Sequence, residues 1–205
     1  TKSSAASDVY KRQLIDNYVI SPVEKYISAT NMRCRVNQHL SGMRRDDGTI
    51  LSYVTNSNGR ARHITLIDPD KQSPETASDR ACVAIDSGSS MIFVGGSTDT
   101  PDEIVHATCV AIQEGLELRA FAASQSPDGD ESKWQVPVVL FPGGSHALSP
   151  AADAITFMML MNSTDRRFLV GEQVRGAPYL DKYGVDALPT GYLVCHPGGK
   201  VGEVG

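Results

Sequence analysis

Five short apolar runs follow one another through the last two thirds of the chain. They show little of the apolar–polar alternation of a half-exposed strand, which is typical of strands buried on both faces of a sheet. Helical spacing fills most of the segments between them, so the pattern predicts βα units and a parallel sheet, an α/β fold. The runs occupy residues 63–68, 89–96, 136–143, 153–163 and 188–197.

Helices are expected between the runs and ahead of them. The pattern predicts helices over about 74–87, 101–123 and 168–183, the second opened by the start signal Thr-Pro-Asp-Glu. Residues 14–29 also have helical spacing. Residues 50–54 resemble a short strand between two turn signals.

Each apolar run ends in polar or glycine-rich residues. Ligands of parallel α/β folds bind at the carboxyl ends of the strands, so the chemistry is expected there. Asp68 ends the first run and could hold Mg²⁺, which prefers oxygen ligands and shares them with substrate phosphates. Capping of the following turn is an equally good explanation of Asp68. The Gly-Gly-Ser-Thr segment at 95–98 precedes a helix and suits an anion, although an ordinary tight turn is the commoner reason for such a segment.

Composition limits the class of protein without naming a function. The 205 residues carry a formal net charge of −5 and are 40% hydrophobic, which suits one globular domain. No apolar run approaches the roughly 18 residues of a membrane span, and no secretory signal is present. The mildly acidic balance argues against a nucleic-acid partner. The cysteines have no paired spacing, so buried, reduced thiols in a cytoplasmic protein are expected, not a zinc site. They are Cys34, Cys82, Cys109 and Cys195.

Other residues with chemical potential have structural explanations. His63 is expected to be structural and His106 to be solvated or packed, whereas His196, at a strand end, could be functional but has no visible partner. Ser145 and Ser149 lack the strand-to-helix elbow of a hydrolase, so a nucleophilic serine is rejected.

Three methionines lie in the fourth apolar run. Core packing is their default interpretation, although soft methionine side chains also suit a pocket for a flexible apolar ligand. They are Met158, Met159 and Met161.

Six segments, taken together, resemble the geranylgeranylglyceryl phosphate synthase family, and within it the archaeal-type group. They occur in the family's order and at compatible spacing across about residues 62–204. The resemblance implies a (β/α)₈ TIM barrel, of which about the first five βα units are expected here. The segments are residues 63–72, 93–98, 138–143, 152–163, 169–178 and 188–202.

The resemblance also implies a reaction. The family transfers a geranylgeranyl group, with Mg²⁺, from geranylgeranyl diphosphate to the 3-hydroxyl of sn-glycerol 1-phosphate, forming the first ether bond of archaeal membrane phospholipids. By resemblance, Asp68 and Ser97 would be the metal ligands, and Gly96, Thr98 and Tyr192 would bind substrate. The family's glycerol phosphate contacts lie on its last three strands. Catalytic residues are therefore expected beyond Gly205, the fragment alone is expected to be inactive, and the complete enzyme is expected to be a homo-oligomer.

Three divisions of the chain follow from these patterns. Residues 3–13 resemble a translated sequencing adapter, so residues 1–13 are interpreted as an artefact. Residues 14–60 are interpreted as an N-terminal helix and insertion, and 61–205 as the partial barrel. Two other functions stay open: a different phosphate-binding TIM-barrel enzyme of the aldolase or isomerase type, and a non-catalytic prenyl-lipid-binding barrel. The aldolase type would need a catalytic Lys or Glu at a strand end, and the five runs show neither.

Overall fold

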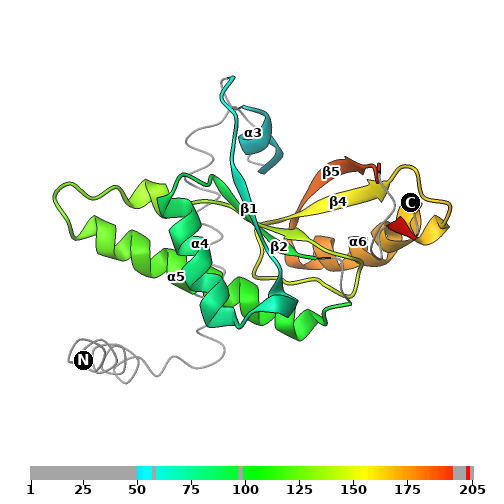
Figure 1. Ribbon diagram of the computed structural model, residues 1–205, viewed down its shortest axis with the longest axis horizontal. Coiled ribbons are helices and arrows are strands. Elements are labelled where there is room, and N and C mark those ends of the chain that lie inside the picture. The colour runs from blue at the N-terminus through cyan, green and yellow to red at the C-terminus, as the bar shows by residue number, and fades with distance from the viewer. Residues whose placement is uncertain (1–49, 57–58, 97–98, 196–201, 204–205) are drawn as a thin grey trace.

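A five-stranded sheet organises the part of the chain that the computed structural model describes, residues 50–56, 59–96, 99–195 and 202–203. The strands lie in sequence order, β1-β2-β3-β4-β5, and every neighbouring pair is parallel (Figure 1). This arrangement confirms the predicted α/β class and is consistent with consecutive strands of a truncated (β/α)₈ barrel. The strands are β1 (Ile64–Ile67), β2 (Met91–Gly95), β3 (Val138–Phe141), β4 (Ala154–Leu160) and β5 (Asp186–Tyr192).

Helices follow β1, β2 and β4, where the sequence predicted them, whereas a loop joins β3 to β4. Helix α4 starts at Pro74, where the Ser73 hydroxyl accepts a hydrogen bond from the Thr76 N–H, and α6 ends at Gly184 in the left-handed conformation. None of the helices among the described residues is long and apolar enough to cross a membrane. The helices are α4 (Pro74–Asp86), α5 (Asp102–Ser124) and α6 (Glu172–Tyr183), with short 3₁₀ turns η1 (Pro69–Lys71) and η2 (Glu131–Trp134) and a π-helical turn η3 (Arg167–Gly171).

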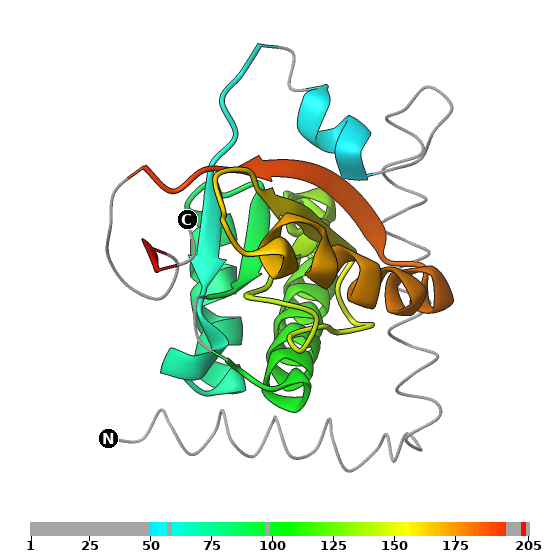
Figure 2. The same cartoon turned by 90° about the vertical axis from the view of Figure 1, so that its right-hand side faces the viewer.

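The two faces of the sheet carry two different apolar clusters. Ile92, Val94 and Leu140 point into the larger cluster, which α4, α5 and α6 cover. Within it Cys82 and Cys109 are buried free thiols, as expected, and burial raises the pKa of Cys109 to about 12. The expectation of burial was wrong for Cys195, which is an exposed free thiol, and Cys34 lies outside the described residues. The alternate residues of the same strands, among them Val139, point into the smaller cluster on the opposite face. Figure 2 shows the resulting layers, with α4 and α5 on one side of the sheet and the short helix α3 (Ile50–Thr55) on the other.

The prediction of a strand over residues 50–54 was wrong, because Ile50–Thr55 form helix α3. The Asp186 carboxylate accepts a hydrogen bond from the Ile50 N–H at 2.9 Å, which satisfies one of the free donors at the start of the helix. Ile50 is fully buried in the smaller cluster, and the Tyr53 hydroxyl donates to the Ser90 carbonyl at 3.0 Å. These contacts with distant residues outweigh the strand preference of an Ile- and Val-containing segment.

Burial on both faces holds only for the inner strands. β2 and β3 are almost wholly buried, whereas Ile64 and Leu66 of β1 are 38% and 52% exposed. β1 and β5 each pair with one strand in the described sheet, so they are its edges and lack the cover of a second neighbour. The core assignment of the methionines was also wrong for Met159 and Met161, which are exposed.

The buried carboxylate of Asp153 joins β3, β4 and α5 at the amino ends of the two strands. Asp153, directly before β4, accepts hydrogen bonds from the Val138 N–H at 2.8 Å and from the Gln113 side-chain amide at 3.1 Å. Its own N–H donates to the Val138 carbonyl at 2.9 Å. One side chain therefore aligns the starts of β3 and β4 with α5.

Asp153→Ala should destabilise the chain strongly. It leaves the buried Val138 N–H and the Gln113 amide without this acceptor, so we expect the free energy of unfolding to fall by about 2–4 kcal/mol. Urea unfolding followed by circular dichroism measures the change. Asp128→Ala, at an exposed position, is the control and should leave stability unchanged. A similar stability for both variants would contradict this role of Asp153.

Candidate functional site

A cavity of about 800 Å³ lies at the carboxyl ends of the strands. Every strand supplies part of its lining, either from its last residues or from the turn that follows. This is the edge of the sheet where the sequence placed the chemistry. The lining residues at the strand ends are Leu66 and Asp68, Gly96, Phe141, Met158 and Leu160, and Tyr192.

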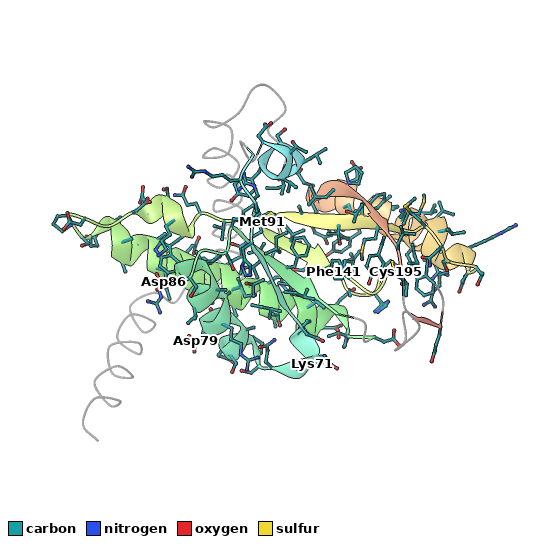
Figure 3. All side chains as sticks on the ribbon, turned by 45° about the horizontal axis from the view of Figure 1, so that its top comes forward. Lys71, Asp79, Asp86, Met91, Phe141 and Cys195 are labelled. Carbon is teal, nitrogen blue, oxygen red and sulfur yellow. The ribbon has the colours of Figure 1, made fainter. Side chains whose placement is uncertain are left out.

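Asp68 caps a turn, which confirms one interpretation of this residue, and it also lines the cavity. Its Oδ1 accepts a hydrogen bond from the Asp70 N–H at 3.1 Å, which starts η1. Its Oδ2 lies 3.1 Å from the Nζ of Lys71, which Figure 3 labels in the turn after β1. The Asp68 side chain is 18% exposed. Oδ1 is therefore engaged by a backbone N–H, and Oδ2 pairs with the flexible side chain of Lys71.

Two glycines shape the neighbouring strand end. A Cβ on Gly96 would lie 2.8 Å from Asp68 Oδ2, and one on Gly95, whose φ is +154°, would lie 1.8 Å from the Phe141 carbonyl oxygen. Both positions need glycine, because a side chain would collide with the carboxylate or with β3. Residues 95–96 thus bring backbone close to Asp68. Ser97 and Thr98, the other residues predicted here, lie outside the described residues.

Asp68 and Gly96 fit an Mg²⁺ ion that is shared with a phosphate ligand. In the described ranges, no three or more His, Cys, Asp or Glu side chains gather into a metal-binding group. Mg²⁺ does not need such a group, since it commonly uses one or two carboxylates together with waters and substrate phosphates. A single carboxylate oxygen, paired only with an exposed lysine and lying beside a glycine backbone, meets that requirement.

Part of the cavity wall is apolar and aromatic. Phe141 stacks on Phe93 with ring centroids 5.8 Å apart and meets the edge of Tyr192 at 6.2 Å. Tyr192 is half-buried and lines the cavity, as does Met158, whereas Met159 does not. The sequence pointed to Tyr192 and to the methionine-rich strand. It missed Phe141, although that residue directly precedes the Pro-Gly-Gly segment that ends its run.

A second carboxylate in the cavity wall is fully engaged. Glu172, the first residue of α6, accepts the Ser145 N–H at 2.7 Å and lies 3.4 Å from both Arg167 and Arg175. Burial raises the pKa of Glu172, but the Ser145 hydrogen bonds and the two guanidinium groups outweigh it, so the pKa lies below its usual value. Sequence reasoning missed this residue, because an acidic side chain in the first turn of a helix is ordinary.

The histidines and serines have the structural roles that the sequence suggested, where they are described. His63 Nδ1 lies 2.7 Å from the Ser89 hydroxyl, and His106 Nδ1 lies 3.0 Å from the buried Ser149 hydroxyl. Ser145 meets Glu172 through its backbone N–H. His196 lies outside the described residues.

Comparison with known proteins shows what this chain is similar to. The profile of the PcrB family matches residues 129–205. A geranylgeranylglyceryl phosphate synthase from Methanothermobacter marburgensis is 42% identical over 146 residues, which is 71% of this chain and 52% of that protein. The chain is related to the geranylgeranylglyceryl phosphate synthases. The synthase from Thermoplasma volcanium is 41% identical over 143 residues, 70% of this chain and 50% of its own length. The chain thus spans about half the length of the curated relatives that it matches.

Solved synthase structures confirm the fold. The wild-type synthase from Thermoplasma volcanium superposes with a TM-score of 0.64 at 37% identity, covering 76% of this chain and 55% of that one. The Thermoplasma acidophilum synthase, solved with its substrate sn-glycerol-1-phosphate, gives 0.61 at 33% identity, covering 76% and 56%. The predicted resemblance and the barrel-type α/β class are therefore confirmed.

Glu172→Gln should destabilise the chain in a pH-dependent way. The lowered pKa means that the ionised carboxylate stabilises the folded state. This contribution is complete above the usual pKa of 4.5 and disappears as pH falls through the lower, folded-state value. The stability gap between wild type and variant, measured by urea unfolding, should therefore be largest near neutral pH and shrink in acid. The exposed Glu103→Gln is the control, and a gap for Glu172→Gln that does not change with pH would contradict the assignment.

Proposed function

We propose that this chain is part of an Mg²⁺-dependent prenyltransferase. It would transfer a geranylgeranyl group from geranylgeranyl diphosphate to the 3-hydroxyl of sn-glycerol 1-phosphate, forming the first ether bond of archaeal membrane phospholipids. One observation carries the proposal. In a chain related to these synthases, a single cavity combines a strand-end carboxylate, Asp68, with an extended aromatic and aliphatic wall. Such a cavity suits a ligand with an anionic head and a long apolar tail.

The polar end of the cavity is the proposed site of the diphosphate. Asp68 would hold Mg²⁺ with the diphosphate oxygens, and Ser97 is the proposed second ligand. When bound, Mg²⁺ would stabilise the negative charge that develops on the leaving diphosphate. Gly96 supports this assignment, because a side chain there would fill the space beside Asp68 Oδ2. Thr98 is proposed to contact the same group.

The apolar end is the proposed site of the prenyl chain. Phe141, Met158 and Tyr192 lie along it, and the cavity volume of about 800 Å³ falls within the range of roughly 300–1,000 Å³ that is typical of small-molecule sites. An apolar wall also keeps water away from an allylic cation, so that a positioned hydroxyl captures it first. The flexible Met158 side chain suits a flexible isoprenoid.

The acceptor site belongs to the longer protein in this proposal. By resemblance, the family's glycerol phosphate contacts lie on the last three strands of the barrel, whereas the described sheet has five. We therefore propose that this chain binds the prenyl donor without completing the transfer. A cytoplasmic location and a homo-oligomeric complete enzyme are further parts of the proposal, and both rest on the resemblance.

An aldolase- or isomerase-type reaction is less well supported. The cavity lining does contain one lysine and two glutamates, Lys71, Glu172 and Glu203, which follow strands instead of ending them. Glu172 is held by Ser145 and two arginines with a lowered pKa, which makes it a poor base near neutral pH. Lys71 is paired with Asp68. These contacts favour the prenyl donor as the ligand.

Asp68→Asn should remove the metal-dependent part of donor binding. We expect isothermal titration calorimetry to show that the chain binds geranylgeranyl diphosphate with Mg²⁺ and that chelation weakens binding at least about tenfold. The Asn variant should bind as weakly with Mg²⁺ as the wild type does without it. Asp128→Asn is the control. Wild-type affinity in Asp68→Asn would contradict the metal assignment, and no donor binding by the wild type would contradict the proposed function.

A further inference from the structure

Lys71 has a position that the proposed reaction does not explain. Its Nζ lies 3.1 Å from Asp68 Oδ2, the carboxylate oxygen that the backbone does not use, and its side chain lines the same cavity. The side chain is nevertheless 72% exposed. The ammonium group is therefore close to the proposed metal ligand but held by little else.

We propose that Lys71 is an exchangeable counter-ion: it neutralises Asp68 when no metal is bound and pairs with the ligand's diphosphate when Mg²⁺ takes Asp68 Oδ2. The inference deepens the proposed function and rests on Asp68 as a metal ligand. Lys71 acts in it as a positioning residue for a diphosphate, and it forms no covalent bond.

The surroundings of Asp68 Oδ2 make Mg²⁺ and the Lys71 ammonium group compete for this oxygen. Asp68 Oδ1 is engaged by the Asp70 N–H, and the space on the Gly96 side of Oδ2 is narrow, since even a Cβ there would come within 2.8 Å of it. Mg²⁺ on Oδ2 would meet the positive Nζ at short range, and like charges repel. An exposed ion pair is weak, and lysine has a flexible four-carbon stem, so the ammonium group can leave at little cost.

A diphosphate bound in the cavity would be a new ion-pair partner for the displaced Lys71 ammonium group. A diphosphate that shares the Mg²⁺ ion brings several negative oxygens to the mouth of the site, within reach of a side chain that already lines it. Lysine binds phosphate as a mobile point charge, so its position can follow the ligand. Metal binding and diphosphate binding thus become coupled through one residue.

Opposite effects on two ligands distinguish this role from a structural one. Removing the charge of Lys71 frees Asp68 from a competitor, so Mg²⁺ alone should bind more tightly. The same change removes a partner of the diphosphate, so inorganic pyrophosphate should bind less tightly at saturating Mg²⁺. Loss of fold would weaken both.

Lys71→Met tests the coupling by calorimetry on the whole chain. We expect Mg²⁺ alone to bind about threefold more tightly than to the wild type, and inorganic pyrophosphate at saturating Mg²⁺ to bind about tenfold more weakly. Lys71→Arg, which keeps the charge, should restore pyrophosphate binding. The matched control is Lys133→Met, which breaks a Lys–Asp pair with Asp86 outside the cavity and should change neither affinity.

Each other result has a defined meaning. Unchanged affinities, or a decrease in both, in Lys71→Met would overturn the exchange while leaving the proposed function intact. A wild-type chain that binds pyrophosphate equally well with and without Mg²⁺, or not at all, would overturn the proposed function itself. Circular dichroism of each variant confirms that the fold is retained.

Discussion

Parallel pairing of consecutive strands is the constraint on which the site depends. Each strand pairs with the next in one direction, so all five carboxyl ends meet at one edge, and residues as far apart as Asp68 and Tyr192 line one cavity. The pairing depends in turn on the opposite edge, where Asp153 aligns β3, β4 and α5. The edge of the sheet at which Asp153 aligns the strands and the edge that forms the cavity are therefore separate. The turns at the carboxyl ends are thus available for ligand binding.

Two of the carboxylates that line the cavity, Asp68 and Glu172, show how the environment of a side chain decides its role. Glu172 lies beside two arginines, which neutralise its charge within the protein. The hydrogen bond that it accepts from the Ser145 N–H joins the loop after β3 to α6. Asp68 commits one oxygen to η1 and shares the other with an exposed lysine. Of these two, Asp68 has the oxygen whose partner is an exposed, flexible lysine, which suits the proposed metal ligand, whereas Glu172 is suited to holding the wall in place.

Patterns local in sequence predicted most of the fold and several of the residues that line the cavity. Unbroken apolar runs marked all five strands, and the polar residue after the first run identified Asp68, because these signals lie within single segments. Helix α3 was missed because Asp186, which holds its first N–H, lies 136 residues away in sequence. Exposure of Leu66 and Met159 could not be predicted from their apolar runs, since exposure depends on which strands and helices become neighbours. Phe141 and Glu172 were missed as site residues for the same reason: each looks ordinary in its own segment.

The proposed function requires that a metal-bound prenyl diphosphate occupies the cavity with its head at Asp68. Anomalous X-ray diffraction from crystals of the chain grown with Mn²⁺ and a thiolo analogue of geranylgeranyl diphosphate would locate both groups. We expect one Mn²⁺ peak at the Asp68 carboxylate, bridged to the diphosphate, with the prenyl chain against Phe141, Met158 and Tyr192. A Mn²⁺ peak away from Asp68, or a prenyl chain bound elsewhere while the cavity stays filled with water, would contradict it.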